Sequence, residues 1–559
     1  MAQLSAIESS SRVRTAVAYP IKQFNVAPVI LATEFGLTVH WNSTSQNPAS
    51  STQHTPVQCS IGTPILDIAV PHISPVEDPA FIPSVFKDSL FVAAACADST
   101  IKIITIPYTA DTTNVQAKII SEFHNQHGIA DLITLTWSLE SDDDTAGAPS
   151  TDSESSDVQI LIASTSKNTP SYLWFHQMMV GKQTVKVVSK PRLPRSILLP
   201  SAPIRISFST ASYTTGRNEQ ILIACGNGMA YVYDPFYEAI EGKPLNPDQD
   251  IGPDNPVRIR WVGRWLGSFS SRFTHREDEV EIAPGLTTRK RLLDAKWAID
   301  STAIVAILAD GEWGVWDVDG SRSTSKTSSG SSFALWGMLG SGIPSHISRP
   351  QETRKSLEPS TFLPTMTPNT RRFKAESLFS GHMTSTSSHS YGGLIVAEQP
   401  LPSADNVEDI VYFWFNDTIC YLDSLQAYWA RAAKRSEDSK LGAGSLFGPA
   451  LTRINGVDVC GMRIAAVSQL PVDADQAETS RTVAIATDHR LQFVSRTPPR
   501  VAGSLIKTLP ERIRPVSNEA QNSLFGQSAE LDVGAMDAIL DQMDASSGDL
   551  QMTGALPAP

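Results

Sequence analysis

Short apolar runs alternate with polar turns along this chain in a pattern that recurs. The clearest copy is AIVAILADGEWGVWDVDG, Ala303 to Gly320, in which two apolar runs flank Asp310-Gly311. Asp-Gly between such runs predicts a β-hairpin with a type I′ turn, because Asp and Gly tolerate the positive φ that this turn needs at both central residues. The second run ends in Trp316-Asp317, a pair typical of propeller blades.

Six further stretches repeat this hairpin, and six of the seven turns carry Asn or Asp. The other copies are Val29 to Trp41, Leu90 to Pro107, Gln159 to His176, Gln220 to Pro235, Asp409 to Asp423 and Arg481 to Arg496. The position six residues past the turn is apolar in every copy: Trp41, Ile104, Trp174, Tyr233, Trp316, Leu422 and Val494. Seven hairpins in phase predict an all-β protein, a seven-bladed WD-repeat β-propeller.

Each hairpin should lie between an inner and an outer strand of its blade. Near-continuous apolar runs, typical of strands packed on both faces, mark the inner strands. These are Val13 to Tyr19, Pro64 to Val70, Leu132 to Leu139, Pro203 to Phe208, Leu292 to Ile299, Leu394 to Glu398 and Val457 to Val467. The expected outer strands are Lys118 to Phe123, Thr184 to Val188, Val257 to Leu266, Phe333 to Leu339 and Val501 to Leu509.

Seven blades of about 40–45 residues need only about 300 residues, and the chain has 559. We therefore expect a propeller over residues 1–510 that carries long disordered insertions. The first, SDDDTAGAPSTDSESSD, is acidic and rich in Ser, and it has no large apolar side chain with which to form a core. The expected insertions are at about 141–157, 236–256, 321–390 and 431–450.

The composition of residues 511–559 predicts an acidic, flexible tail with one amphipathic segment. No Lys or Arg occurs from residue 515 onward, and AELDVGAMDAILDQMD predicts a short helix at about 530–544. Its apolar stripe could pack on the propeller or bind a partner, and we take it as a candidate partner-binding surface. The stripe contains Leu531, Met536, Ile539, Leu540 and Met543.

Charge and composition narrow the classes of partner. The formal net charge of −13 and the pI near 5.4 disfavour direct binding of nucleic acid, which needs a basic surface. No apolar run approaches the ~18 residues of a membrane span, so we expect no membrane insertion. The five cysteines are scattered and form no CxxC motif, which is typical of reduced thiols.

Catalytic and metal-binding motifs are not found in the sequence. GxSxG, a P-loop, HExxH and an EF-hand loop are all absent. His124 and His127 lie three residues apart, but no third ligand accompanies them. The sequence therefore predicts no catalytic, metal-binding or cofactor-binding residues, and it favours a binding scaffold over an enzyme.

Four blade segments have a distinctive sequence: LDIAVP at Leu66 to Pro71, AAACADSTIKIITIP at Ala93 to Pro107, CGNGMAYVYDP at Cys225 to Pro235, and RKRLLDAKW…LADGEWGVWD within Arg289 to Asp317. Together they resemble the filamentous-fungal members of one nucleoporin family. The family is the small WD-repeat nucleoporin of the Y-shaped outer-ring scaffold complex, and the resemblance covers about residues 1–500.

This resemblance implies a seven-bladed propeller without catalysis at the nuclear pore complex of the nuclear envelope. It also implies other outer-ring nucleoporins as partners, chiefly a large propeller-plus-helical one, and support of pore assembly, mRNA export and protein import. It assigns no interface residues.

Two other functions fit a propeller of this kind. One is a WD-repeat substrate receptor of a cullin ubiquitin ligase, although such receptors usually carry Arg two residues after Trp-Asp. Here Val318-Asp319 follows Trp316-Asp317. The other is a noncatalytic subunit of an RNA-modifying enzyme, which the acidic balance disfavours.

Overall fold

The structure, a computed structural model, describes most of the chain up to residue 496. The described residues are 4–496 except 24–25, 44–55, 109–115, 126–127, 140–156, 182–184, 188–195, 242–257, 262, 272–288, 321–331, 340–389, 401–406, 439–450, 458, 460 and 473–480. All of them belong to one compact unit, Met1–Pro498. The predicted tail and most of the predicted insertions lie outside the described residues.

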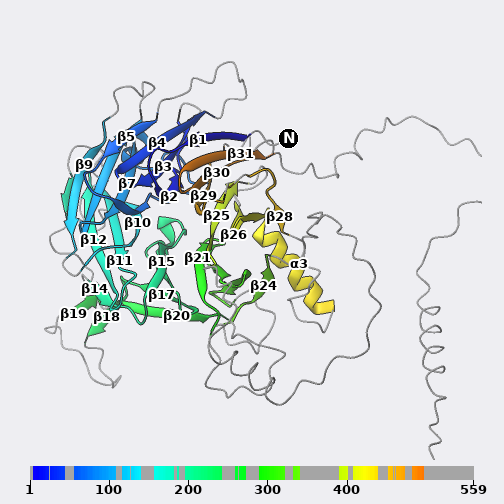
Figure 1. Cartoon of the computed structure of the whole chain (residues 1–559). Coiled ribbons are helices and arrows are strands. Elements are labelled where there is room, and N and C mark those ends of the chain that lie inside the picture. Colours follow the sequence, from blue (N-terminus) through cyan, green and yellow to red (C-terminus); the bar gives the residue numbers. More distant parts are fainter. Residues whose placement is uncertain are drawn as a thin grey trace, which may run out of the picture. The chain divides into compact units, whose positions relative to one another are not determined.

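Seven antiparallel sheets, which we number as blades in chain order, make up the described part, as Figure 1 shows. Blade 1 contains β2 (Val13–Ala18), β3 (Val26–Thr33), β4 (Gly36–Ser43) and β5 (Val57–Ser60). Blade 2 contains β6 (Ile65–Ala69), β7 (Ser89–Cys96), β8 (Thr100–Pro107) and β9 (Lys118–His124). Blade 3 contains β10 (Leu132–Leu139), β11 (Val158–Thr165), β12 (Tyr172–Val180), β13 (Val185–Val187) and β14 (Ser196–Leu198).

The remaining blades follow the same order from the inner strand outward. Blade 4 contains β15 (Pro203–Phe208), β16 (Ile221–Cys225), β17 (Met229–Asp234) and β20 (Arg264–Ser270). Blade 5 contains β21 (Leu292–Ala298), β22 (Ala303–Leu308), β23 (Glu312–Asp317) and β24 (Leu335–Met338). Blade 6 contains β25 (Gly392–Pro400), β26 (Val407–Phe415), β27 (Thr418–Leu422) and β28 (Thr452–Arg453). Blade 7 contains β29 (Ile464–Gln469), β30 (Arg481–Thr487), β31 (Arg490–Arg496) and β1 (Leu4–Glu8).

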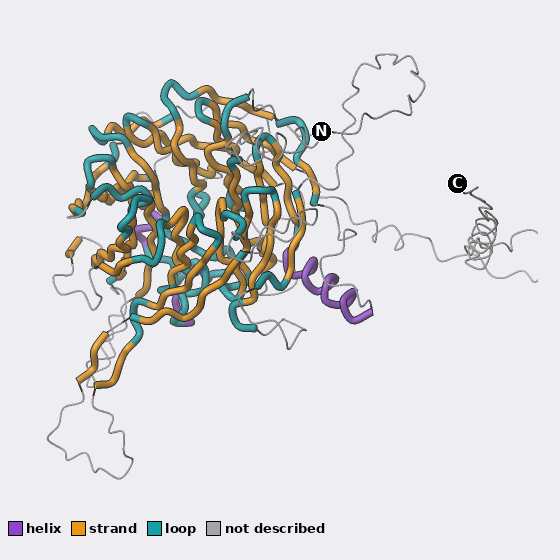
Figure 2. The backbone as a smooth tube through the Cα atoms, turned by 60° about the horizontal axis from the view of Figure 1, so that its bottom comes forward, coloured by secondary structure: helices purple, strands orange, loops and turns teal. Residues whose placement is uncertain are grey.

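The seven inner strands contact one another in a closed circle, from β2 and β6 round to β29 and back to β2. This arrangement is a seven-bladed β-propeller, and it confirms the predicted fold class. Figure 2 shows the strands grouped around a common centre. The seven hairpins predicted from the sequence are the second and third strands of the seven blades.

The outer strand of blade 7 comes from the other end of the chain. β1 pairs with β31, from Leu4 opposite Val494 to Glu8 opposite Arg490. The predicted strand Val501 to Leu509 lies outside the described residues, and its expected place in the sheet is occupied by β1. The N-terminal strand therefore closes the ring, a pairing between chain ends that local patterning does not reveal.

Three hairpins close with the same turn, which differs from the predicted type I′. A single residue is left-handed in each: Ser99 (φ 66°), Gly228 (φ 83°) or Gly311 (φ 84°). The preceding Asp98, Asn227 or Asp310 is not left-handed, and its Oδ1 accepts a hydrogen bond from the N–H two residues further on. In these three turns, Asn or Asp is favoured because its side chain accepts this bond. In the blade 6 turn, by contrast, Asn416 itself is left-handed (φ 50°).

Apolar clusters between neighbouring blades form the core, and we call each such interface a seam. Six of the seven residues at the position six past the turn are buried, whereas Trp174 is half-buried. Trp316, Tyr233 and Trp41 each belong to a cluster that joins two blades. Asp317 is also buried and lies opposite Ala303 in the sheet.

Three short helices and one additional hairpin complete the described part. The helices are α1 (Ser84–Asp88), η3 (Tyr213–Thr215) and α3 (Leu425–Asp438). α3, the longer purple helix in Figure 2, covers the start of the predicted 431–450 insertion, where we expected no structure. β18 (Glu238–Glu241) pairs with β19 (Arg258–Trp261), so the 236–256 insertion begins in a hairpin and Val257 to Leu266 spans two separate strands.

Candidate functional site

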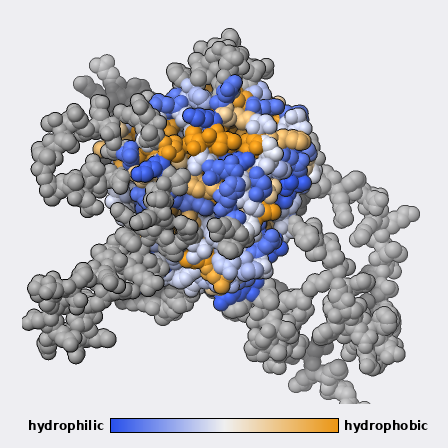
Figure 3. Space-filling model, turned by 90° about the vertical axis from the view of Figure 1, so that its left-hand side faces the viewer, coloured by the Kyte–Doolittle hydropathy of each residue, from blue (hydrophilic) through white to orange (hydrophobic). Residues whose placement is uncertain are grey.

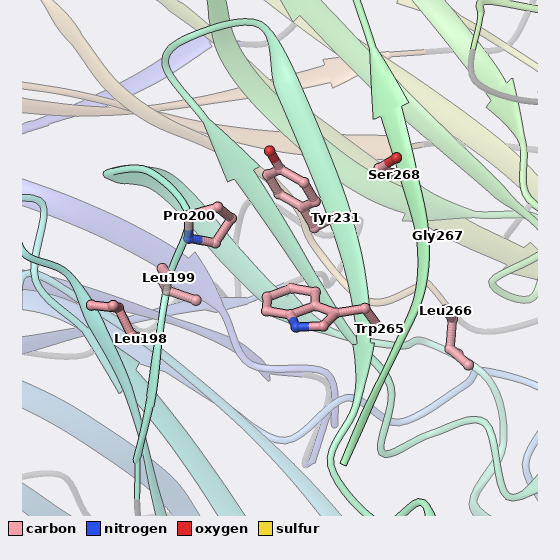
Figure 4. Close-up of a pocket in the computed structure, with 8 residues that line it drawn as sticks. All are labelled: Leu198, Leu199, Pro200, Tyr231, Trp265, Leu266, Gly267 and Ser268. Atoms are coloured by element: carbon pink, nitrogen blue, oxygen red, sulfur yellow. The ribbon is translucent and has the colours of Figure 1, made fainter.

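An open apolar groove lies at the outer end of the seam between blades 3 and 4. Its volume is ≈ 520 Å³. Leu198, Leu199 and Pro200, from β14 and the residues after it, form one wall, and Tyr231 of β17 and Trp265 of β20 form the other. Figure 4 shows the indole of Trp265 reaching across toward Leu199, with the Tyr231 ring above it. We call this site the seam groove.

Two large apolar side chains of the seam groove are exposed. Leu198 is 59% exposed and Trp265 is 42% exposed. The indole of Trp265 packs against Tyr231 and Tyr233, at ring-centroid distances of 5.8 Å and 5.0 Å. Figure 3 views the side of the propeller on the left of Figure 1, where apolar side chains gather in patches among polar ones. Apolar patches on a propeller's side are typical of surfaces that contact other proteins.

Aromatic side chains from added segments of the chain cover the next two seams. Between blades 4 and 5, Phe333 stacks on Trp316 at 4.6 Å. Between blades 5 and 6, Tyr428 of α3 lies 5.7 Å from Trp313. Trp316 and Trp313 are 0% and 1% exposed, so an added aromatic side chain completes each of these seams. At the seam between blades 3 and 4, Trp265 packs in the same way on Tyr233, which holds the repeat position of Trp316, and its outer side stays exposed.

Two buried aspartates tie neighbouring blades together near the centre of the ring. Asp67 of β6 accepts hydrogen bonds from the N–H groups of Ile68 (3.0 Å) and Ile133 (3.2 Å), the latter in blade 3. Asp294 of β21 repeats this pattern toward blade 6, with Ala295 (2.9 Å) and Leu394 (3.1 Å) as donors. Burial raises the pKa of Asp67, and the attraction of Arg205 partly opposes that shift. Because these carboxylates accept hydrogen bonds from backbone N–H groups of two blades, their role is structural.

The connection from β6 to β7 crosses from blade 2 to blade 6. His72 Nε2 lies 3.1 Å from Glu398 Oε1, and the Ser74 hydroxyl donates to Glu398 Oε2 at 2.7 Å. Burial by itself would lower the pKa of His72, but Glu398, Glu77 and Asp409 attract the imidazolium and raise it overall. The same contacts lower the pKa of Glu398 against the effect of its burial. An ion pair thus links two non-adjacent blades.

This ion pair predicts a pH-dependent part of the stability. The folded-state pKa of His72 is raised. The contribution of this residue to the free energy of unfolding is therefore fully present below about pH 6.5, and it disappears as pH rises through the folded-state pKa. The lowered pKa of Glu398 gives a contribution that is present above about pH 4.5 and is lost in more acidic solution. We expect the difference in unfolding free energy between the wild type and His72→Gln to shrink as pH rises above about 6.5.

Urea titrations over a range of pH would measure that difference, with the exposed His489→Gln as the control. Burial raises the pKa of Asp409 to about 7, and this carboxyl also loses its contribution as pH rises. Because the charge of His72 lowers the Asp409 pKa, this effect differs between the two proteins. Repeating the comparison in an Asp409→Asn background removes it. A difference independent of pH would mean that His72 is neutral in the fold.

The structural blade residues singled out in the sequence are spread over blades 1, 3, 4 and 5 rather than gathered in one site. Trp41, Tyr233, Trp316 and Asp317 are buried within the blades, and Asp310 and Gly311 form a turn. The proposed partner-binding residues Leu531, Met536, Ile539, Leu540 and Met543 lie outside the described residues. The sequence analysis missed the seam groove, although the adjacent Trp265 and Leu266 break the apolar-polar alternation of β20 and could have signalled an exposed apolar site.

The described residues bring no group of three or more His, Cys, Asp or Glu side chains together as a metal site. Within the same residues, no helix is long and apolar enough to cross a membrane. Among the described residues, the features that stand out are a closed ring of seven blades, interblade ties and an open apolar groove. They define a β-propeller of the kind that presents surfaces to other proteins.

Comparison with known proteins identifies the family. The model of the nucleoporin NUP37 N-terminal domain matches residues 43–494, which include blades 2 to 6 and most of blade 7, but only the outer strand β5 and the last residue of β4 from blade 1. The chain belongs to the nucleoporin NUP37 family, and its location is the nuclear pore complex at the nuclear envelope. The suspected family of the sequence analysis is thereby confirmed.

One relative and two solved structures give the extent of the similarity. Nucleoporin NUP37 of Chaetomium thermophilum (strain DSM 1495 / CBS 144.50 / IMI 039719) is 24% identical over 425 residues, which are 67% of this chain and 53% of that protein. The chain thus spans about half the length of this curated relative. "Structure of U3-55K" superposes with TM-score 0.41 at 8% identity over 88% of this chain and 98% of that one. "Crystal Structure of Mitotic Checkpoint Complex" gives 0.39 at 8% identity over 88% and 91%.

Proposed function

We propose that this protein is a non-catalytic scaffold propeller of the outer ring of the nuclear pore. It docks on a larger propeller-plus-helical nucleoporin and so supports pore assembly, mRNA export and protein import. The observation that carries the proposal is the family match over residues 43–494. The closed ring of blades with an open groove on its side supports it, because a propeller of this kind can present a surface to a partner.

Affinity purification of the tagged full chain tests this proposal. We expect other nucleoporins to co-purify in stoichiometric amounts, with a large propeller-plus-helical chain as the direct contact in a reconstituted pair. Recovery of a cullin adaptor or an RNA-modifying enzyme in place of nucleoporins would support one of the two alternatives.

The acidic tail gives a second, separate prediction. A short helix is marginal alone in water, so an apolar stripe such as Leu531, Met536, Ile539, Leu540 and Met543 needs a surface to cover it. We expect deletion of residues 527–559 to leave the melting temperature of the propeller nearly unchanged and to weaken association with at least one partner. Thermal unfolding and co-purification measure the two effects.

Two results would contradict the tail prediction. A melting temperature lowered by several degrees would show that the segment stabilises the protein's own fold. Unchanged stability together with unchanged association would show that the stripe has no binding role.

A further inference from the structure

We propose that a small anion carrying phosphate groups binds at the centre of the ring, with Arg205 of β15 and Lys296 of β21 as its cationic contacts. We call these two side chains, together with the buried Asp67 and Asp294, the central charge cluster. The inference goes beyond the proposed scaffold function, because it concerns a small-molecule ligand of the propeller and not a nucleoporin partner.

Three members of the central charge cluster occupy the same position of the repeat. Asp67, Arg205 and Asp294 each directly follow a register shift near the start of the inner strand, in blades 2, 4 and 5. Propeller blades surround a central channel, so equivalent positions of inner strands meet there. The charges of Arg205 and Lys296 indeed interact with that of Asp67, although blades 4 and 5 are not neighbours of blade 2.

The two carboxylates of the cluster are satisfied from within the wall of the ring. Asp67 and Asp294 are only 7% and 2% exposed. Each of their four carboxylate oxygens accepts a hydrogen bond from a backbone N–H group of the same or the adjacent blade. Their negative charge is therefore committed to holding the blades together.

The two cations, by contrast, keep unused donors. Arg205 Nε donates to Asp294 Oδ1 at 3.1 Å, but the Arg205 side chain remains 30% exposed. Lys296 is half-buried. Among the described residues, the terminal nitrogens of Arg205 and the Nζ atom of Lys296 have no hydrogen-bond partner. The groups that are available to a ligand at the centre of the ring are therefore positively charged donors.

The proximity of these two cations is unfavourable until an anion joins them. Burial lowers the pKa of Lys296 to about 8, the charge of Arg205 adds to this shift, and Asp294 and Asp67 oppose it. An anion bound between Arg205 and Lys296 would remove the repulsion. A phosphate group suits this pair, because the planar guanidinium matches two phosphate oxygens and the ammonium adds a point charge.

Isothermal titration calorimetry of the full-length protein with pyrophosphate tests the proposal, at low ionic strength where screening is weakest. We expect saturable binding and a melting temperature that rises with pyrophosphate concentration, because a ligand of the folded state stabilises it. Lys296→Met should weaken binding about tenfold or more, as expected when one charge-assisted hydrogen bond is lost. Lys118→Met is the matched control, since it neutralises an exposed lysine of the outer strand β9, and it should bind like the wild type.

The contribution of Arg205 needs a variant that preserves its ion pair. Arg205→Lys keeps a cation beside Asp294 but lacks the planar fork, so it should bind pyrophosphate more weakly than the wild type. The Lys296 variants leave the bond between Arg205 and Asp294 intact and test the site even if Arg205→Lys is unstable. Melting temperatures without ligand show which variants are folded.

The pH dependence of binding gives a readout that is specific to Lys296. Sulfate is the probe here, because its charge stays constant in neutral and mildly alkaline solution. Sulfate binding should weaken as pH rises through about 8, where Lys296 loses its charge. Lys296→Arg stays charged in this range and should lack this part of the dependence. Arg205, Asp294 and Asp67, the charged groups that act on Lys296, are present in both proteins.

Three results would overturn the proposal. One is the absence of measurable binding of both anions. The second is an equal loss of affinity in Lys296→Met and Lys118→Met, which would show that the anions associate only with the surface. The third is binding that requires deletion of residues 511–559, which would make the acidic tail the occupant of the site. None of these results bears on the scaffold function, which co-purification tests separately.

Discussion

Trp316→Ala should lower the free energy of unfolding by about 3–5 kcal/mol, the range for truncating a large buried aromatic side chain. The side chain of Trp316 is 0% exposed. Its indole Nε1 donates to the Ser270 carbonyl of blade 4 at 3.3 Å, and its ring packs on Phe269 and Phe333. The substitution would leave a cavity across the seam between blades 4 and 5 and remove the hydrogen bond to the Ser270 carbonyl.

Trp174→Ala is the matched control, because Trp174 occupies the same repeat position and is only half-buried. We expect a clearly smaller loss there, since a half-buried side chain leaves no closed cavity. Urea unfolding followed by circular dichroism measures both variants without relying on tryptophan fluorescence. A loss below about 1 kcal/mol at Trp316, the size of an average substitution effect, would contradict the cross-blade packing.

Asp294→Ala should lower the free energy of unfolding by a similar amount, about 3–5 kcal/mol, as when one partner of a buried ion pair is removed. The Asp294 carboxylate is 2% exposed. It accepts bonds from Ala295 N, Leu394 N and Arg205 Nε, the last at 3.1 Å. Removing it would leave a guanidinium and two backbone N–H groups without their acceptor where blades 4, 5 and 6 meet.

Asp319→Ala is the control for the second prediction. Asp319 pairs with Arg217 at 2.6 Å, but its side chain is 34% exposed. An ion pair at the surface contributes at most about 1 kcal/mol. Asp294→Asn, which keeps an acceptor for one N–H, should fall between the two alanine variants. Equal losses in Asp294→Ala and Asp319→Ala would show that the interblade tie does not stabilise the ring.

The repeat could be predicted from the sequence because the apolar runs and turn residues of each blade lie within one short hairpin. The run from Ala303 to Leu308 is apolar on both faces, and its residues are buried as predicted. Burial on both faces is a property of every strand between two blades, so the pattern recurs each time. The turn residues were also readable, although the reason for Asp310 differs from the expected one: its side chain accepts a hydrogen bond while its backbone stays out of the left-handed region.

The interblade carboxylates left a weak signal that only the structure explains. Asp67 and Asp294 interrupt otherwise apolar strands at the same place, LDIA and LDAK. An acid inside such a run has either a partner or a function. Their partners are backbone N–H groups 66 and 100 residues further along the chain, and no local pattern identifies donors at that distance.

The sequence by itself determined the all-β class, the seven blades and the family, because these follow from side-chain periodicity and turn chemistry within each hairpin. The tertiary structure alone decided how the blades meet. It placed β1 beside β31 to close the ring, joined His72 to Glu398 across two non-adjacent blades, and packed Tyr428 of α3 on Trp313. Each of these depends on segments distant in the chain, and which of them come into contact is fixed only when the ring closes.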